Sequence, residues 1–344
     1  MKEVHIKLTV KDIQSHITVQ YPLYRLHIDK SDLGKSDKEK QNFNLFAVAR
    51  VNQNVKDLIV DLANNGYFLV EHKNGISIFE KFTTAEKFKH NLTTSNVQIF
   101  HDLFYTLDSP KIETKRPRLL VVFSSVADFS LNASISRRNF FTNFGTIGKY
   151  IPQNTYILRI SDIGGVVGSF YMNNNFHKNV ESNVQNLLKF ILLQKNINKN
   201  DLVLYGVSKA GTAALYHSIL GEYKSISVDP IVSDVYHERK YNDSHFTQGT
   251  FPSTKQNKFI DLMRRTTIHS SINILYSQNS PIYLDIITVI KNNDIKDKIN
   301  YIHTNHPKIK DHPDVGPNTI NILTMILNNL YYDFSAISSK KLEC

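Results

Sequence analysis

The sequence has a single cysteine, no tryptophan and no long apolar run. The cysteine is Cys344, so no disulfide can form within the chain, and a reducing compartment is expected. No segment offers the roughly 20 apolar residues of a membrane-spanning helix, and residues 1–7 alternate charged and apolar types, unlike a signal peptide. These absences predict a protein of the cytoplasm, free or peripheral at the inner membrane face, that does not span the membrane.

The composition is that of a globular protein with a basic surface. Hydrophobic residues make up 41% of the 344 residues, enough for one large domain or two ordinary ones. Lys and Arg number 41 against 31 Asp and Glu, for a formal charge of +10, which favours anionic partners. The basic residues are scattered and no nucleic-acid motif is present, so nucleic acid is not the expected partner.

The most informative segment is a short apolar strand, Leu202 to Tyr205, that runs into Gly206-Val-Ser208-Lys-Ala-Gly211 and then a helix of small residues. This pattern is typical of a nucleophile elbow, the strained strand-to-helix turn of α/β-hydrolases. Small residues around the turn let the strand and the helix approach closely. Ala210 stands where the usual G-x-S-x-G pattern has its second glycine, which is a mild departure. We therefore expect Ser208 to be a nucleophile, with its hydroxyl at a helix N-terminus.

The chain divides into two expected regions. Residues 1–110 form a smaller α+β module, with a helix near residues 51–62 and a hairpin around Asn74-Gly75. Residues 111–344 form an α/β-hydrolase-like domain, a mostly parallel sheet wrapped by helices, with an insertion at about 230–271. Its expected strands are 119–123, 155–160, 202–205, 225–228, 272–276 and 299–302, and its expected helices include 184–193, 209–220 and 319–330.

A serine nucleophile needs a base and a group that orients the base. The last strand is followed by three histidines, of which we favour His312, because the segment around it leads into the final helix. His306 is the alternative base. The acid usually follows the strand 272–276, but Ser277-Gln-Asn-Ser-Pro281 holds no carboxylate. Asp229, at the end of the preceding strand, is our preferred acid.

Other assignments of the acid stay open. Asp285 lies a few residues beyond Pro281, Asp314 lies beside His312, and a Ser–His dyad needs no acid at all. The nucleophile also needs two N–H donors for an oxyanion, and we expect them from Lys209 and from the loop 124–126, with Ser125 preferred.

Substrate contacts are expected from two loops at the same rim. The glycine-rich loop 161–173 contains Asp162, and the insertion contains Arg239 and Lys240 within Tyr236-His-Glu-Arg-Lys-Tyr241. The two basic residues suggest an anionic glycan or glycan precursor, although a solvated basic face explains them as well. No metal-binding pattern and no tightly bound cofactor are expected.

Two segments together carry a family resemblance: Ser161-Asp-Ile-Gly-Gly-Val-Val-Gly-Ser-Phe-Tyr-Met-Asn173 and Tyr205-Gly-Val-Ser-Lys-Ala-Gly211. They resemble the hydrolase-like domain of bacterial capsular polysaccharide biosynthesis proteins and a related accessory secretion-system protein of glycoprotein acetylation. Asn65-Gly-Tyr-Phe-Leu-Val70 is also similar to the capsule family, so the resemblance covers about residues 50–330.

The resemblance implies a serine-dependent O-acetyltransferase or esterase that acts on a capsular polysaccharide or its precursor. Ser208 would be its nucleophile and His312 its late histidine. Acetyl-CoA is the candidate acyl donor, and other capsule biosynthesis proteins are candidate partners. The missing carboxylate after Tyr276 supports a different hypothesis, in which the fold persists as a noncatalytic subunit of the capsule assembly machinery.

Overall fold

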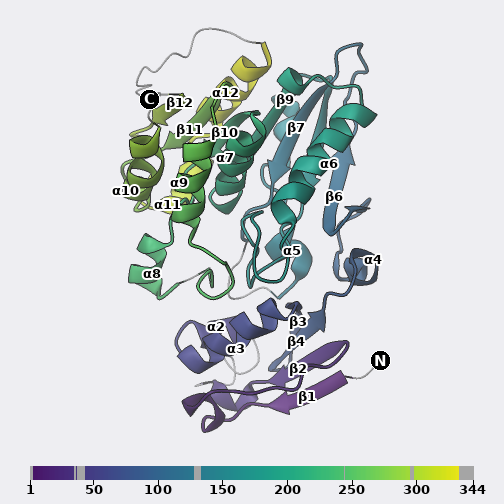
Figure 1. Cartoon of the computed structure of the whole chain (residues 1–344), viewed down its shortest axis with the longest axis vertical. Coiled ribbons are helices and arrows are strands. Elements are labelled where there is room, and N and C mark those ends of the chain that lie inside the picture. Colours follow the sequence, from purple (N-terminus) through teal and green to yellow (C-terminus); the bar gives the residue numbers. More distant parts are fainter. Residues whose placement is uncertain are drawn as a thin grey trace.

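The computed structural model describes residues 3–34, 36, 43–127, 133–243, 245–294 and 298–332. It contains two sheets, one of four strands and one of eight. The small sheet lies in the module at the bottom of Figure 1, and the large sheet lies above it with helices on both faces. Among the described helices, none combines the length and the apolar character needed to cross a membrane.

The small module is a mixed sheet covered by two helices. Its strand order is β1 (Glu3–Lys7), β2 (Arg25–Asp29), β4 (Ile76–Lys81) and β3 (Tyr67–Lys73). Strands β1 and β2 are parallel, and the other pairs are antiparallel. The expected hairpin is confirmed, with Asn74 and Gly75 both at positive φ in its turn. Helices α2 (Leu45–Ala49) and α3 (Gln53–Asn64) place their apolar sides in the core of this module.

The large sheet is parallel over six strands and ends in two antiparallel ones. Its order is β12 (Ile299–His303), β11 (Ile272–Tyr276), β10 (Lys224–Val228), β9 (Leu202–Val207), β7 (Arg118–Phe123), β8 (Thr155–Ile160), β6 (Leu103–Asp108) and β5 (Gln98–Phe100). All six strands expected from the sequence are present within two residues of their expected bounds. The fold class is therefore confirmed as α/β-hydrolase-like.

The boundary between the two parts of the chain does not lie at residue 110, where the sequence predicts it. Strands β5 and β6 precede that residue, yet they extend the large sheet through the pairing of β6 with β8. This pairing joins Tyr105 to Ile160, far apart in the sequence, and local sequence patterns do not reveal such contacts. The large domain therefore begins before residue 98.

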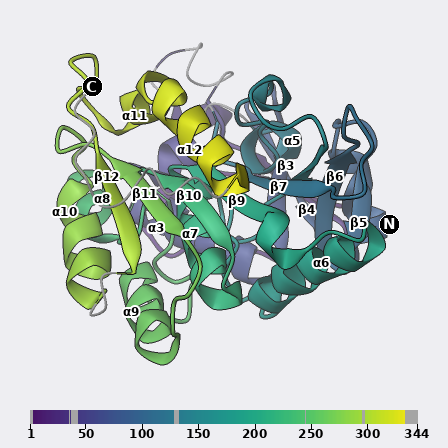
Figure 2. The same ribbon diagram turned by 90° about the horizontal axis from the view of Figure 1, so that it is seen from above.

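Alternation along β7 assigns the two faces of the large sheet. Leu119, Val121 and Phe123 pack on the face covered by α6 (Val180–Gln194) and α7 (Lys209–Gly221). Leu120 and Val122 pack on the opposite face, which α12 (Ile320–Tyr332) covers. Figure 2 shows this three-layer arrangement, with α9 (Lys255–Arg265) on the α7 side and α11 (His312–Asn318) on the α12 side.

The remaining elements are short. Helices α4 (Ala85–Phe88) and α5 (Ile135–Asn139) share an apolar cluster with β3 and β6. Helix α8 (Val235–Tyr241) belongs to the insertion, and α10 (Tyr283–Asp285) follows β11. The 3-10 helices are Asp12–Gln14, Ser31–Leu33, Lys89–Asn91, Ile147–Lys149, Lys199–Asp201 and Lys291–Asn293, and one π-helical turn spans Ile286–Ile290.

The small module lies against the carboxyl ends of the large parallel strands. The Lys56 ammonium donates to the Asn242 carbonyl at 2.9 Å, and the Asn64 amide donates to the Gly249 carbonyl at 2.9 Å. Val166 and Val167, in the loop after β8, join the apolar core of the small module. Loops that follow β8 and β10 are therefore fixed between the two parts of the chain.

Candidate active site

Ser208 stands on the turn between β9 and α7 with a backbone φ of 58° and ψ of −124°. A non-glycine residue at positive φ costs about 1–3 kcal/mol, which the surrounding structure must offset. The turn is closed tightly, since a Cβ on Gly206 would lie 2.0 Å from the Ala210 carbonyl oxygen. The Ser208 N–H donates to the Val228 carbonyl at 2.9 Å, which ties the turn to β10. The local geometry is that of a nucleophile elbow.

Ser208, His312 and Asp229 form one hydrogen-bonded chain. His312 Nε2 lies 2.7 Å from Ser208 Oγ, and His312 Nδ1 lies 2.7 Å from Asp229 Oδ2. His312 is the first residue of α11, whose N-terminus is fixed by a capping box between Asp311 and Asp314. The Asp229 carboxylate is fully buried, whereas the His312 side chain is 16% exposed. The imidazole thus faces the serine from a fixed helix end.

Asp229 reaches His312 because its backbone turns sharply after β10. Its φ is 44°, and its N–H donates to the Leu275 carbonyl at 2.8 Å. The loop after β11, which lacks a carboxylate, instead supplies the Ser280 hydroxyl, which donates to Asp229 Oδ2 at 2.5 Å. The buried Asp229 Oδ1 has no hydrogen-bond partner within the described ranges. A hydroxyl from the usual acid loop therefore supports a carboxylate from the neighbouring strand.

The residues considered as an alternative base or acid make contacts outside the Ser208–His312–Asp229 chain. His306 Nδ1 accepts from the Lys308 N–H at 3.3 Å, and Asp314 accepts from the Lys310 N–H at 3.0 Å. Asp285 lies in α10, where its carboxylate bonds to the Tyr236 backbone and to Ser233, and burial raises its pKa. The structure thus brings together the preferred histidine and the preferred carboxylate.

The loop after β7 is fixed beside the elbow. Ser125 Oγ donates to the Val207 carbonyl at 2.7 Å, and the Asn143 amide donates to Ser125 Oγ at 3.0 Å and to the Phe123 carbonyl at 2.7 Å. Because its hydroxyl is used in this way, Ser125 can serve an oxyanion only through its backbone. On the other side, Lys209 is the first residue of α7, where backbone N–H groups lack intrahelical partners.

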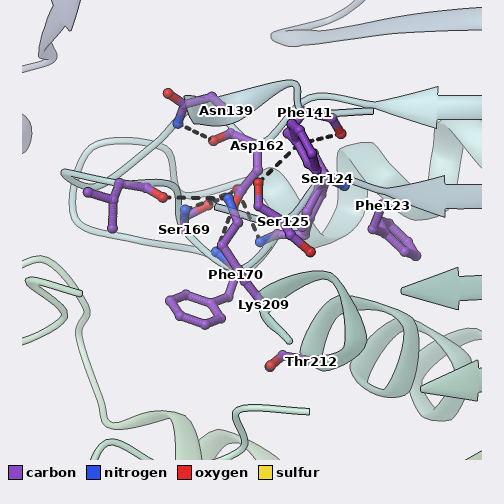
Figure 3. Close-up of polar contacts among 12 residues, drawn as sticks. Phe123, Ser124, Ser125, Asn139, Phe141, Asp162, Ser169, Phe170, Lys209 and Thr212 are labelled. Carbon is purple, nitrogen blue, oxygen red and sulfur yellow. Dashed lines mark hydrogen bonds and ion pairs between the residues drawn. The ribbon is translucent and has the colours of Figure 1, made fainter. Parts of the chain in front are cut away.

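The Lys209 side chain enters a buried ion pair with Asp162, drawn in Figure 3. Lys209 Nζ lies 2.8 Å from Asp162 Oδ2. Burial lowers the pKa of Lys209 below its ordinary value, although the negative charge of Asp162 opposes this shift. The Asp162 carboxylate also accepts from the backbone N–H groups of Ser169, Phe170 and Tyr171 and from the Ser169 hydroxyl, at 2.9–3.2 Å. These donors occupy both carboxylate oxygens.

Asp162 therefore does not occupy the place expected of a substrate contact. Only 2% of it is exposed, and it does not line the cavity above Ser208. It holds the loop 162–171 against Lys209, the residue that follows Ser208. The same loop also reaches the opposite side of the elbow, since Tyr171 Oη donates to the Ile160 carbonyl at 2.6 Å and accepts from the Ser124 N–H at 2.7 Å.

A cavity of about 560 Å³ opens above Ser208. Its described lining is mainly apolar and aromatic, with no Lys, Arg, Asp or Glu. It consists of Ser125, Val126, Phe141, Asn143, Phe144, Tyr205, Val207, Ser208, Ile231, His237, His245, His312, Pro313, Gly316, Pro317 and Ile320. His237 and His245 come from the insertion and were not singled out from the sequence. His237 could have been found in the sequence, because it lies in the segment 236–241, but only the neighbouring Arg239 and Lys240 were interpreted as substrate contacts.

Arg239 and Lys240 lie elsewhere. They line a second cavity of about 600 Å³, between α8 and the small module, together with Arg50, Glu238 and Tyr241. The Lys240 ammonium donates to the Tyr236 hydroxyl at 2.7 Å. Helix α8 therefore contributes His237 to the cavity above Ser208 and the basic pair to the second cavity.

Fold and site together define the class, an α/β-hydrolase-like protein with a Ser–His–Asp arrangement at the carboxyl edge of its sheet. No protein-family model and no curated protein matches the chain. Among solved structures, the chain is similar to the glycosylation-associated protein complex of Streptococcus agalactiae, with a TM-score of 0.51 and 16% identity over 79% of this chain. It spans 53% of that structure's chain, about half its length.

A second similar structure is the capsule O-acetyltransferase of Neisseria meningitidis serogroup A. The TM-score is 0.49 and the identity 15%, over 70% of this chain and 99% of the other. A histidine-to-alanine mutant of that enzyme, solved in complex with CoA, gives the same values. At such identities the likeness between these structures and the chain is one of fold.

Proposed function

We propose that this protein catalyses serine-dependent acyl transfer or ester hydrolysis on a surface polysaccharide, such as a capsular one, or on its precursor. The observation that carries the proposal is the continuous chain from Ser208 through His312 to Asp229, with both contacts at 2.7 Å. This is the spacing that a nucleophile, a base and an orienting group need. We expect the oxyanion donors from the backbone of the residues around it.

In the proposed mechanism, Asp229 accepts from Nδ1–H of His312, which leaves Nε2 free to take the Ser208 proton. Ser208 Oγ then attacks the acyl carbonyl, and the oxyanion is stabilised by N–H groups of Lys209 and of the loop 124–126. Collapse of the tetrahedral intermediate expels the leaving group, which receives the proton from His312. Ser208 is then an ester.

In the second half of the reaction, His312 takes a proton from water or from an acceptor hydroxyl, whose oxygen attacks the Ser208 ester. The new C–O bond forms as the bond to Ser208 Oγ breaks, and Oγ recovers the proton from His312. Hydrolysis and transfer differ only in the acceptor. For transfer, acetyl-CoA is the candidate donor, with no tightly bound cofactor required.

The proposed substrate class draws support from the resemblance of the two loop segments and from the name of the streptococcal neighbour, a glycosylation-associated protein. Other proteins of capsule biosynthesis are proposed as partners on the same grounds. A negative group on such a glycan would be bound by Arg239 and Lys240, in the cavity beside the one that holds Ser208.

The alternative of a noncatalytic subunit rested on the missing carboxylate after Tyr276. Asp229, which stands 2.7 Å from His312, supports the enzyme over this alternative. The test of the proposed function is labelling with a fluorophosphonate probe, which we expect at Ser208. Absence of labelling in the folded protein, or labelling that persists in Ser208→Ala, would refute the enzyme assignment.

A further inference from the structure

The insertion places two imidazoles on the cavity above Ser208. His237 belongs to α8, and His245 follows that helix. Their rings contact each other edge to face, with centroids 4.4 Å apart and an interplanar angle of 62°. The insertion itself is held in place by a buried ion pair between Asp234 and Lys255, and by the Asp243 carboxylate, which accepts from the Thr247 N–H at 3.0 Å. The two rings therefore stand on an ordered support.

His237 carries an unused polar atom. Only 7% of this residue is exposed, and its buried Nδ1 has no hydrogen-bond partner within the part of the chain that the structure describes. A buried polar atom without a partner costs about 1–3 kcal/mol, so it requires a reason such as a ligand. The His237 ring itself lies in the wall of the same cavity as Ser208 and His312, so a substrate bound in the cavity contacts this imidazole.

The imidazole of His237 is neutral at physiological pH. Burial is the main cause that lowers its pKa to about 3, and the nearby Lys255 ammonium contributes to the same shift. A neutral imidazole offers one N–H donor and one bare nitrogen acceptor. It therefore suits a partner that can both donate and accept.

The cavity excludes the other common partners. Its described lining has no Lys or Arg to neutralise a phosphate or carboxylate, and no Asp or Glu to bind a cation. The nearest basic pair along the chain, Arg239 and Lys240, opens onto the separate cavity between α8 and the small module. An uncharged hydroxyl, which donates and accepts at once, matches His237 in either tautomer.

We propose that His237 binds an uncharged hydroxyl of the acyl acceptor within the Ser208 cavity, so that the reacting face of the acceptor is a neutral polyol. This inference rests on the proposed function. Charged parts of a longer glycan remain outside the cavity. In the transfer step, the acceptor hydroxyl next to the Ser208 ester gives its proton to His312, while His237 holds a second hydroxyl of the same polyol.

The test uses the full chain with p-nitrophenyl acetate as donor and four acceptors: glycerol, methyl glucoside, glucuronate and glucose 6-phosphate. Acetylated products are quantified against acetate released to water. For the two neutral polyols, we expect the ratio of acetylated product to released acetate to exceed the ratio of polyol to water in the solution. For the two anions we expect a lower ratio of acetylated product to acetate. His237→Phe keeps the ring volume and should raise the KM for the neutral polyols about tenfold, the value of one hydrogen bond of 1.4 kcal/mol.

Two further variants keep the result interpretable. His237→Gln retains a donor and an acceptor and should restore part of the affinity, and His269→Phe, at an exposed position outside both cavities, should leave the KM unchanged. An unchanged KM in folded His237→Phe, a preference for the anions, or no transfer to either neutral polyol would overturn the inference. Loss of fluorophosphonate labelling in the unmodified protein would instead refute the proposed function itself.

Discussion

The hydroxyl of Tyr171 accepts a hydrogen bond from the Ser124 backbone N–H at 2.7 Å. Ser124 begins the loop after β7, whereas Tyr171 ends the loop that binds Lys209 through Asp162. One loop therefore fixes both sides of the elbow from which we expect the oxyanion donors. Fixed dipoles stabilise developing charge without reorganisation, and a loosened pair would lose that advantage.

Tyr171→Phe removes this link and leaves the ring in place. Burial raises the pKa of Tyr171 well above its ordinary value, so the hydroxyl is protonated and its donor bond to Ile160 is lost as well. We expect kcat for p-nitrophenyl acetate to fall about tenfold or more, with little change in KM, because the N–H groups act mainly in the transition state. Tyr156→Phe, in β8 and outside the cavity, is the matched control. A fall in thermal stability with unchanged kcat would assign Tyr171 a structural role only.

Asp229→Asn tests the acid. The amide preserves the shape but donates toward His312 Nδ1, which favours the wrong tautomer for accepting the Ser208 proton. We expect kcat to fall by roughly 10³–10⁴. Asp285→Asn, in α10, is the control and should cost little. The opposite ranking of the two variants in the same assay would place the acid in the helix after Pro281.

Much of the fold and part of the site follow from local sequence patterns. The parallel strands are buried on both faces and read as short apolar runs, and the elbow needs small residues at fixed spacing, as at Gly206. Asp229 could be proposed because it ends a strand, and parallel strands end at one edge of the sheet. These inferences use only neighbours in the sequence.

The parts that could not be predicted depend on long-range contacts. The pairing of β6 with β8 adds an antiparallel edge that no local pattern marks. Asp162 lies in a loop that looks ligand-binding, yet three backbone N–H groups and Lys209 occupy its carboxylate. His237 lines the Ser208 cavity through the tertiary placement of α8, which local sequence patterns do not reveal.

The Lys209–Asp162 pair should contribute to stability more than a surface pair. Both side chains are buried, with exposures of 1% and 0%. Asp162→Asn leaves the Lys209 ammonium without a countercharge, and breaking such a pair costs about 3–5 kcal/mol. Urea unfolding should show a loss of that size in the free energy of unfolding extrapolated to water. Lys7 and Asp32, whose side chains are 58% and 44% exposed, form a surface pair, and Lys7→Gln should change the free energy of unfolding little. Equal effects of the two changes would contradict the argument.

The basic pair on α8 should make glycan affinity depend on salt. If Arg239 and Lys240 bind a negative group, affinity for a phosphorylated or carboxylated oligosaccharide should weaken as ionic strength rises, since added ions screen exposed charges. A neutral oligosaccharide should show little dependence. The double variant Arg239→Ala and Lys240→Ala should lose this salt dependence, which titration calorimetry can measure. The same response for both oligosaccharides would exclude this surface as an anion site.

Acid should destabilise the protein through His217, a buried residue in the second half of α7. Its Nδ1 accepts from the Gln185 amide at 3.1 Å, and its Nε2–H donates to the Tyr171 carbonyl at 2.9 Å, so the bonded form is the neutral one. Burial lowers the pKa of His217 to about 4, below the ordinary value of 6.5. Between pH 6.5 and pH 4, His217 is protonated in the unfolded chain but stays neutral in the folded protein. The free energy of unfolding must therefore fall as pH decreases from about 6.5 toward 4. The loss from this one group is at most about 3 kcal/mol, at 1.36 kcal/mol for each unit of pKa difference.

The measurement is urea unfolding at pH 7, 6, 5 and 4.5 for the unmodified protein and for His217→Gln. Glutamine cannot titrate, and its amide can still donate to the Tyr171 carbonyl. The variant should be less stable at pH 7 and should lose less stability on acidification. The remaining slope comes from other buried imidazoles, since burial also lowers the pKa of His177 to about 4. Parallel stability profiles for the two proteins would mean that His217 does not resist protonation in the folded state, and the acid sensitivity would then have to arise elsewhere.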